Sequence, residues 1–383
     1  MLEKVRPLRI AFIGGRGIGS VYSGIETIYE EVGSRLVTYG HEVLAYSRRH
    51  TTTAGADFRG VIPIFRPCIR TKHAETYSHT LISTFDVLFR RVDIIQFHAL
   101  GPSLFAWIPR LCGRRTINTI HGLDWQREKW GVFATSFLQF CERMSYRVPN
   151  ATVVVSRTLQ KHYRDRYGVE VHHIPNGVTL EPSPPPREIH ALGLRGRDYF
   201  LFMGRISPEK GLDSLIEAYR QVAGRAKLVI AGGSSYTDSY AQSLRQGSPE
   251  GVIFPGWVGG RLRAELYANA AAFILPSTIE GQSIALLEAM SHSACVISSE
   301  IPENRELVDG VGFTVGAREV EGLASLLVRV LDNPDEAQEL GQRARARVEA
   351  EYTWDEVSRR TEAFYYAVLG MPQPVRPYAD QRP

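Results

Sequence analysis

The chain has 383 residues, of which 44% are hydrophobic and 22% charged, and its formal net charge at pH 7 is +4. This length is enough for two domains that each bury a core. No apolar run approaches the ~18 to 20 residues of a membrane-spanning helix, and the first residues show no signal-peptide pattern, so we expect a cytoplasmic protein. The cysteines contain no Cys-x-x-Cys pair, so neither a zinc site nor a disulfide framework is expected; they are Cys68, Cys112, Cys141 and Cys295.

Charge is unevenly divided along the chain. Residues 1–178 contain 24 Lys and Arg against 14 Asp and Glu, which leaves 21 against 27 for the remainder. The first half is therefore about +10 and the second about −6. A basic half is typical of proteins that meet nucleic acid, an anionic membrane surface or a phosphorylated substrate, and a solvated surface explains the scattered arginines equally well. The sequence has no zinc-finger spacing and no aromatic–basic RNA-binding signature, so we expect no nucleic-acid partner.

The first half alternates apolar runs with helical ones. Residues 8–14 form a buried-strand run that leads into a glycine-rich turn, and residues 25–39 have the pattern of a helix that ends at Gly40. Strands that alternate with helices predict a doubly wound parallel sheet, whose ligands bind beyond the carboxyl ends of the strands. Further strands are expected at 61–65, 92–97, 116–120, 152–155 and 171–174.

The glycine-rich turn matches a dinucleotide-binding loop only in part. Its spacing Gly15-x-Gly17-x-x-Ser20 lacks the third glycine, and Arg48 and Arg49 stand where an acid would close the next strand. An NAD site is therefore not expected. Two interpretations remain open: the loop around Gly17 presents backbone donors to a substrate or phosphate, or it is only a tight turn.

Two histidines, His98 and His121, stand at the ends of expected strands. His121 opens the segment HGLDWQREKWG, in which Asp124 and two tryptophans crowd a glycine-flanked loop. Tryptophans are rarely left in water, so we expect this loop to pack over something, with His121 and Asp124 as candidate catalytic residues. A purely structural histidine is the alternative. The pair His172–His173 alternates on a strand without companion ligands, which indicates a structural role.

The proline-rich segment 179–186 is a stiff linker by composition, and it separates a domain of residues 1–178 from one of residues 187–350. The final helix, 354–369, is too apolar for a solvated tail, so we expect it to cross back onto the first domain. Residues 371–383 have the composition of a disordered tail. In the second domain, strands are expected at 199–203, 227–233, 252–256, 270–275 and 296–299, with 301–304 closing the sheet and long helical segments over 317–350.

Two motifs of the second domain carry candidate chemistry. Arg205 follows a strand and Lys210 begins a helix, so both cations can converge on a diphosphate; an ordinary basic loop is the alternative. Glu280 falls in the loop after the strand at 270–275, and Glu288 on the next helix among apolar residues, where a carboxylate is costly to bury without a partner. A loop acid and a solvated helix acid are the alternative. Gly281 lets the backbone approach a ligand closely.

Together these motifs resemble glycosyltransferase family 4, which has the GT-B architecture. The resemblance covers nearly the whole chain through the glycine loop, the linker, GRISPEKG, EGQSIALLEAM and IPENREL. The segments GGRGIGSVYSGIET and HGLDWQREKWG are further similar to a subgroup of rhamnosyl- and related transferases of cell-surface polysaccharides. One departure is the run from Ser291 to Cys295, where the family carries glycine and proline; it bears on the base or ribose pocket and so on the donor.

The resemblance implies an α/β fold of two Rossmann-like doubly wound domains that face a cleft, and retaining transfer from a nucleotide-diphosphate sugar. Position by position, it implies that Arg205 and Lys210 hold the donor diphosphate, that Glu288 bonds the ribose hydroxyls and that Glu280 bonds the donor sugar. Gly281, Gln282 and Ser283 are carried over as donor-binding residues with them. Because the two cations offset charge on the leaving diphosphate and the chain has no Asp-x-Asp pair, we expect neither a metal nor another cofactor.

Three classes of function remain open from the sequence: a glycosyltransferase, a sugar phosphorylase or epimerase on the same architecture, and a catalytically silent sugar-nucleotide-binding protein. The basic first half is expected to face an anionic acceptor. We favour a lipid-linked sugar at the inner membrane leaflet, with peripheral association of the protein there. A soluble small-molecule natural product is the alternative acceptor.

Overall fold

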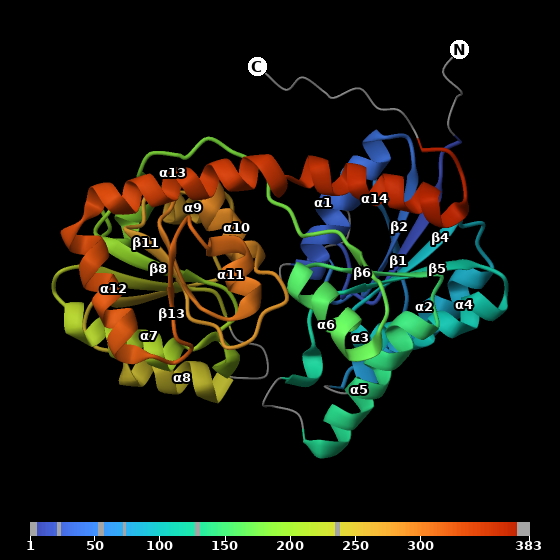
Figure 1. Cartoon of the computed structure of the whole chain (residues 1–383), viewed down its shortest axis with the longest axis horizontal. Coiled ribbons are helices and arrows are strands. Elements are labelled where there is room, and N and C mark those ends of the chain that lie inside the picture. Colours follow the sequence, from blue (N-terminus) through green and yellow to red (C-terminus); the bar gives the residue numbers. More distant parts are fainter. Residues whose placement is uncertain are drawn as a thin grey trace, which may run out of the picture.

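The computed structural model describes residues 6–20, 24–52, 57–71, 74–126, 131–233 and 238–373. Two α/β domains lie side by side along the long axis of the molecule, the first on the right and the second on the left of Figure 1. Each is a parallel sheet with helices on both faces. The predicted α/β fold of two Rossmann-like domains is thus confirmed. Within the described ranges, no helix has the length and apolar character needed to cross a bilayer.

The first domain contains a seven-stranded sheet in the order β3-β2-β1-β4-β5-β6-β7. The sheet is all parallel and is covered on both faces, which explains why its central strand β1 is a buried apolar run from Ile10 to Ile13. The strands are β1 (Arg9–Ile13), β2 (Glu42–Ser47), β3 (Ile62–Phe65), β4 (Ile94–His98), β5 (Arg115–Ile120), β6 (Ala151–Val154) and β7 (His172–His173). The helices are α1 (Gly24–Thr38), α2 (Ala74–Leu88), α3 (Leu100–Ser103), η1 (Leu104–Ala106), α4 (Trp107–Leu111), η2 (Asp124–Gln126), α5 (Val132–Arg147) and α6 (Arg157–Tyr167).

The second domain contains a six-stranded parallel sheet in the order β10-β9-β8-β11-β12-β13. Its strands are β8 (Tyr199–Met203), β9 (Lys227–Ala231), β10 (Val252–Gly256), β11 (Ala272–Leu275), β12 (Val296–Ser299) and β13 (Phe313–Val315). The helices are η3 (Glu188–Leu192), η4 (Pro208–Lys210), α7 (Leu212–Tyr219), η5 (Arg220–Val222), α8 (Asp238–Gly247), α9 (Gly260–Ala268), α10 (Ile284–Ser291), α11 (Pro302–Val308), α12 (Val320–Asp332) and α13 (Pro334–Glu351).

The sheet of the second domain ends differently from the prediction. Residues 301–304 were expected to close it, but Pro302 begins α11 and the edge strand is β13. Proline suits the first position of a helix because its missing N–H has no partner there. The three-residue strand β13 is too short and too exposed to give a periodic signal. The helical stretch at 317–350 is also divided, into α12 and α13, where Pro334 starts the second helix.

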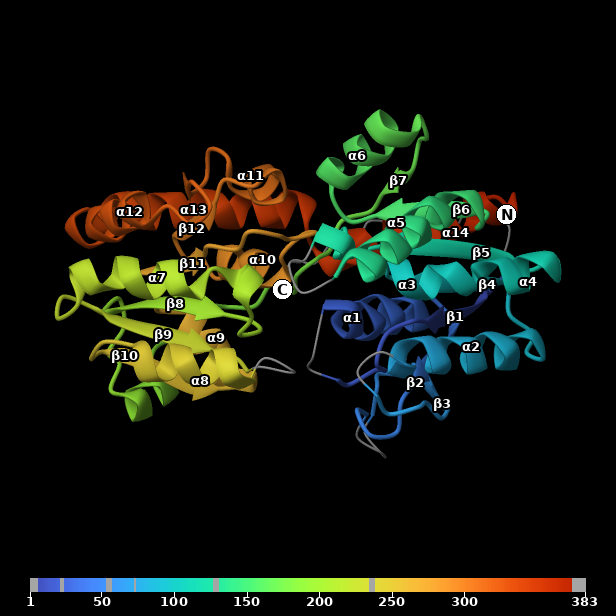
Figure 2. The same cartoon turned by 90° about the horizontal axis from the view of Figure 1, so that it is seen from below.

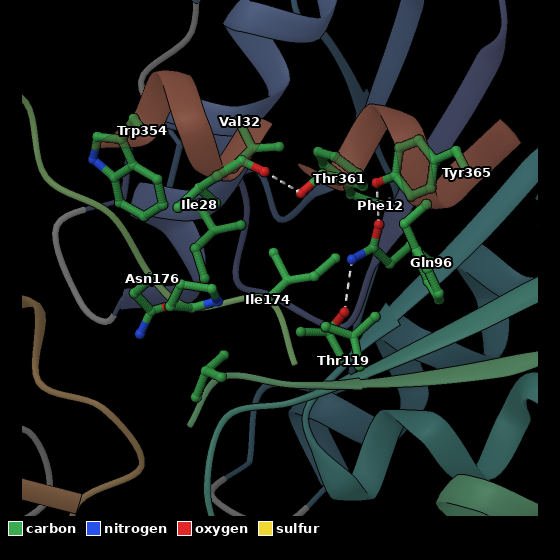
Figure 3. A pocket seen from close by; sticks show the side chains of 15 residues that line it. Phe12, Ile28, Val32, Gln96, Thr119, Ile174, Asn176, Trp354, Thr361 and Tyr365 are labelled. Carbon is green, nitrogen blue, oxygen red and sulfur yellow. Dashed lines mark hydrogen bonds between the residues drawn. The ribbon is translucent and has the colours of Figure 1, made fainter. Parts of the chain in front are cut away.

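The final helix, α14 (Trp354–Leu369), leaves the second domain and lies on the first, beside α1. Trp354, Phe364, Tyr365 and Tyr366 are buried in a core that they share with β1 and α1. Figure 3 shows Tyr365 pointing from α14 toward the buried Gln96, to whose side-chain oxygen it donates a hydrogen bond. The cavity beside this contact is small, about 30 Å³. The C-terminal helix is therefore an integral part of the first domain's core.

Candidate active site

A cleft of about 600 Å³ lies between the two domains. Its walls are loops at the carboxyl ends of the strands on both sides. In each sheet the strand order reverses next to the first strand of the domain: successive strands are added on one side of β1 and β8 and then, from β4 and β11 onward, on the other. Ligands of doubly wound sheets bind at such switch points. The two switch points face each other here, so the cleft is the candidate site.

On the second-domain wall, Arg205 and Lys210 both line the cleft. Arg205 follows β8, and Lys210 ends the short helix η4. The Lys210 ammonium lies 2.6 Å from a carboxylate oxygen of Glu280, and both side chains are mostly buried. Next to them Gly211 has φ 67°, and a Cβ there would lie 2.3 Å from the carbonyl oxygen of Pro276. Only glycine fits this turn, which is how the loop brings its two cations to the wall.

Glu288, on α10, lines the same wall and is held by two residues of α9. Arg263 Nη2 lies 2.9 Å from Glu288 Oε1, and the Tyr267 hydroxyl donates to Glu288 Oε2 at 2.9 Å. Burial raises the pKa of Glu288, while the Arg263 guanidinium lowers it. The partner that a buried carboxylate at this position requires is thus supplied by the protein itself.

Sequence reasoning missed Arg263 and Tyr267. Their i, i+4 spacing predicts only that they share a helix face, and nothing local connects α9 with Glu288, which follows it by more than twenty residues. Trp257, half exposed at the end of β10, also lines the cleft and was missed. The rule that ligands bind beyond strand ends, applied to the expected strand at 252–256, would have found it.

Residues 291–295, where the sequence differs from the glycine and proline of the family pattern, lie behind Glu288. The His292 ring stacks on the ring of Tyr267, with centroids 6.1 Å apart and an interplanar angle of 11°. The Ser291 hydroxyl donates to the backbone carbonyl of Glu288 at 2.8 Å. In the described part of the chain, none of residues 291–295 is on the cleft lining. Residues 291–295 therefore contact the pocket only indirectly, through the Tyr267 ring and the α10 backbone.

The loop of Gly281, Gln282 and Ser283 touches the first domain. A Cβ on Gly281 would lie 1.7 Å from the carbonyl oxygen of His121. Asn176 donates to Gln282 twice, from its backbone N–H to Oε1 at 2.5 Å and from Nδ2 to the backbone oxygen at 3.1 Å. The Ser283 hydroxyl accepts from Leu286 N–H at 3.3 Å and caps α10. All three line the cleft, and the structure shows the two domains in contact at this loop.

His121 and Asp124 line the first-domain wall. His121 stacks on His98, with ring centroids 5.3 Å apart, and its Nε2 lies 3.1 Å from His98 Nδ1. Burial lowers the pKa of His121 to about 4, against the opposing effect of Asp124. His121 is therefore a neutral imidazole at pH 7. Trp125 of the same loop packs inside its own domain, where its indole N–H donates to Glu142 at 2.8 Å; Trp130 falls outside the described residues.

The first part of the glycine loop is a tight turn whose backbone N–H groups at Gly15 and Arg16 are bonded within the domain. Gly15 N–H donates to the Tyr29 hydroxyl at 3.0 Å, and Arg16 N–H donates to Glu26 at 2.8 Å. Gly17 is buried with φ 130°, and a Cβ there would meet Thr52. The cleft lining begins after it, at Gly19. The structure thus does not bring Gly17 to the cleft.

The basic residues of the first domain are absent from its described part of the cleft lining. Among its described residues, the first domain contributes the acids Glu30, Glu31 and Asp124 to the cleft lining and no lysine or arginine. Arg127 and Lys129 fall outside the described residues. The expectation that the basic charge faces the second substrate inside the cleft is therefore not met by the described wall.

The described residues include one group that could hold a metal ion, formed by His50, Cys68 and Glu75. Glu75 already has partners: His50 Nε2 lies 2.6 Å from it and the buried Arg48 guanidinium 3.4 Å. A guanidinium this close competes with a cation for the carboxylate. None of the three possible ligands is on the cleft lining.

Two family models match the chain, "Glycosyltransferase Family 4" over residues 22–182 and "Glycosyl transferases group 1" over residues 197–333. Among curated proteins, it is 27% identical to an alpha-maltose-1-phosphate synthase of Mycolicibacterium smegmatis, over 67% of this chain and 74% of that protein. It is 28% identical to a GDP-mannose-dependent monoacylated alpha-(1-6)-phosphatidylinositol monomannoside mannosyltransferase of Corynebacterium glutamicum, over 71% of this chain and 75% of that protein.

Solved structures share the fold. The chain matches sucrose-phosphate synthase of Thermosynechococcus elongatus with a TM-score of 0.82 and 19% identity, over 95% of this chain and 100% of the other. It matches HepE of Anabaena in complex with UDP and glucose with a TM-score of 0.78 and 15% identity, over 94% and 100%. The two matched models between them cover both domains, and the chain belongs to the glycosyltransferases of family 4 (group 1), with the GT-B fold.

Proposed function

We propose that this protein is a retaining glycosyltransferase that moves a sugar from a nucleotide-diphosphate donor to an acceptor without a metal ion. The observation that carries the proposal is the second-domain wall. Arg205 and Lys210 lie there beyond the carboxyl end of β8, on the same wall as the carboxylates of Glu280 and Glu288. This is one compact set of cations and hydroxyl acceptors on a single wall, as a sugar nucleotide requires.

The donor diphosphate is held by Arg205 and Lys210. Transfer builds negative charge on the leaving diphosphate, and cations fixed in place before the reaction stabilise that charge without reorganisation. In the structure the Lys210 ammonium is paired with Glu280 at 2.6 Å. A bound diphosphate would share this ammonium with Glu280, and the Glu280 carboxylate would then turn toward the hydroxyls of the donor sugar. No metal is required for this charge balance.

The nucleoside end of the donor lies along α9 and α10. Glu288 accepts from the ribose hydroxyls, and Arg263 and Tyr267 hold its carboxylate in position from behind, at 2.9 Å each. Trp257 offers a half-exposed ring for stacking against the base. Gly281, Gln282 and Ser283 bring the α10 amino terminus and the interdomain contact to the donor sugar.

The first-domain wall receives the acceptor. His121 and Asp124 lie opposite the Glu280 loop, and Gly281 is in contact with the His121 carbonyl. As a neutral imidazole, His121 can donate one hydrogen bond and accept another, so it orients the reacting sugar and acceptor hydroxyls without adding charge. Asp124, close to His121 in the chain, is the acid of this wall that we assign to the reaction with it.

We propose a lipid-linked acceptor in cell-surface polysaccharide biosynthesis. The names of two relatives support this: the mannosyltransferase of Corynebacterium glutamicum acts on a phosphatidylinositol mannoside, and an Escherichia coli relative, 27% identical over 44% of this chain, is an O-antigen chain mannosyltransferase. A soluble natural product is the alternative acceptor.

The test is turnover of nucleotide sugars with and without acceptor lipid extract. A transferase releases free nucleotide diphosphate only when acceptor is present, and EDTA leaves the rate unchanged. An epimerase changes the sugar without acceptor, and a phosphorylase requires inorganic phosphate. NMR of the product then shows whether the anomeric configuration of the donor is kept. An inverted product removes the retaining assignment, and binding without turnover on any acceptor reduces the protein to a sugar-nucleotide-binding protein.

A further inference from the structure

The first domain carries an exposed apolar surface outside the cleft. Large hydrophobic side chains are exposed on three of its helices, α2, α4 and α5. Phe89, just after α2, is 90% exposed and Phe133 of α5 is 92% exposed. A single exposed hydrophobic side chain is normal, but a group of large ones on neighbouring helices indicates an interaction surface. We call the following set the aromatic face: Phe85, Phe89, Trp107, Leu111, Phe133 and Phe140.

Helical spacing keeps these side chains on the outer side of their helices. Phe85 and Phe89 are four residues apart, and Phe133, Phe137 and Phe140 recur at intervals of four and three. The inner sides of the same helices are also apolar; Val87, for example, is fully buried. These helices therefore have a second apolar side that no described residue of the chain covers.

The three helices form one continuous surface. In the structure α2 packs against α4 and η1, and η1 and α3 pack against α5. The rings of Tyr77 on α2 and Phe137 on α5 meet edge to face, with centroids 5.7 Å apart. Figure 2, which shows the molecule from below, presents α2, α3, α4 and α5 together on the first domain. The exposed apolar side chains thus stand on neighbouring helices of one layer.

The border of the aromatic face is positively charged. Exposed arginines stand on α4 and α5 and in the segments that follow α2 and α4: Arg110, Arg143 and Arg147 on the helices, Arg91 after α2, and Arg115 at the start of β5. The acids of these helices do not oppose them. Glu75 and Glu142 are buried, and Asp86 is paired with Arg66 and Arg90. Part of the positive charge of the first half is therefore displayed on this surface, and none of it on the described wall of the cleft.

We propose that the aromatic face docks the protein on an anionic membrane surface. Exposed Phe, Trp and Leu side chains insert at the boundary between the headgroups and the acyl chains of a bilayer, and exposed arginines gain from anionic lipid. A second copy of the chain fits this face poorly, because a two-fold contact sets its arginines against one another. The helix α5 follows the loop that begins at His121, so docking brings the mouth of the cleft to the bilayer. The inference deepens the proposed function, because a lipid-linked acceptor would be presented there.

The test is sedimentation of the full chain with vesicles of phosphatidylglycerol mixed with phosphatidylcholine, and of phosphatidylcholine alone. We expect binding to the anionic vesicles that weakens as salt is raised, because surface electrostatics are screened, and much weaker binding to neutral ones. The variant Phe89→Ser with Phe133→Ser should lower the partition coefficient about tenfold for each ring, at low and at high salt. Leu180→Ser, which removes an exposed leucine of the linker, is the matched control and should bind as wild type.

The arginines are tested separately. Arg110→Ser with Arg143→Ser should weaken binding roughly fivefold for each charge at low salt and much less at high salt. Arg343→Ser, which removes an exposed arginine of α13, is the control and should have no effect. Because all the substituted side chains are exposed, unchanged melting temperatures will show that folding is intact.

Two results would overturn the docking proposal. One is wild-type protein that stays in the supernatant with anionic vesicles even at low salt. The other is a doubled mass in sedimentation analysis that Phe89→Ser with Phe133→Ser converts to a monomer, because the face then binds a second copy. Binding of nucleotide sugars is measured on the same samples. Vesicle binding without nucleotide-sugar binding supports docking and removes the proposed function. Nucleotide-sugar binding without vesicle binding supports the proposed function and removes docking.

Discussion

The two walls of the cleft have the same architecture and different chemistry. Both are strand-end loops at the switch point of a parallel sheet. The second-domain wall carries Lys210 paired with Glu280 and Arg263 paired with Glu288. The described first-domain wall carries a neutral histidine beside three acids and no basic side chain. This difference is the basis of our proposal that the charged donor binds to the second wall and that the first wall positions the acceptor. Substitutions on the second wall should therefore mainly weaken donor binding, and substitutions on the first wall should mainly lower kcat.

The largest effect is expected at Lys210. In Lys210→Ala the diphosphate loses a charge-assisted contact and Glu280 loses its partner, which together should cost about 3 kcal/mol, or roughly 150-fold in kcat/KM. Steady-state kinetics with the donor varied measures this. Lys161→Ala, which removes an exposed lysine of α6, is the control. Kinetics of Lys210→Ala and Arg205→Ala that match wild type would take the diphosphate away from this wall.

Gly281→Ala breaks the contact between the walls. The new methyl group would lie 1.7 Å from the His121 carbonyl, so the domains must move apart. A misplacement of about 1 Å can lower kcat roughly 100-fold. Donor affinity should change little, because the second wall stays intact. Gly247→Ala, where nothing lies within 4 Å of the added Cβ, is the control. Equal kcat values for the two variants would show that this contact is absent from the reacting state.

Glu288→Gln tests the nucleoside side of the second wall. An amide accepts hydrogen bonds less well than a carboxylate and pairs weakly with Arg263, so donor KM should rise about tenfold with kcat nearly unchanged. The raised pKa of Glu288 gives a second readout. As pH falls toward that pKa the carboxylate becomes protonated, so wild-type donor KM should rise on acidification. A KM that is flat with pH and equal in the variant would contradict the assignment.

The smallest effect is expected at His121. Loss of one neutral hydrogen bond in His121→Ala should lower kcat about fivefold and change donor KM less. Burial sets the pKa of His121 to about 4, below its unfolded value of ~6.5. The folded state therefore binds fewer protons than the unfolded one between these values, and stability is lost as pH falls from ~6.5 toward 4. The wild-type kcat profile should show no inflection near pH 6.5 from this group; an inflection that His121→Ala removes would mean that His121 titrates normally.

The sequence predicted what local patterns determine and missed what tertiary packing determines. Apolar runs located most strands of the two sheets but not the edge strand β13. The turn after Met203 and the loop after Leu275 placed Arg205, Lys210 and Glu280 beyond strand ends, where the structure has them. Arg263 and Tyr267 could not be assigned, since their link to Glu288 exists only when α9 packs beside α10.

Two further expectations were not met, because they depended on tertiary contacts that a sequence does not show. The glycine loop looked capable of binding a phosphate, but Tyr29 and Glu26 take up the N–H groups of Gly15 and Arg16. The excess of positive charge in the first half was correctly counted, but the number of charged residues does not say on which face of the domain they lie. Helical phase and burial show that arginines such as Arg110 and Arg143 stand on α4 and α5, away from the described wall of the cleft.

Thermal unfolding with a panel of UDP-, GDP- and dTDP-sugars tests the division of labour between the walls most directly. A donor at 100 times its Kd stabilises the folded state by about 2.7 kcal/mol. We predict a raised melting temperature with at least one nucleotide sugar for wild type and for His121→Ala, and none for Arg205→Ala with Lys210→Ala. An equal shift in all three proteins, or a shift that His121→Ala abolishes and the second-wall variant keeps, would contradict the assignment of the donor to the second domain.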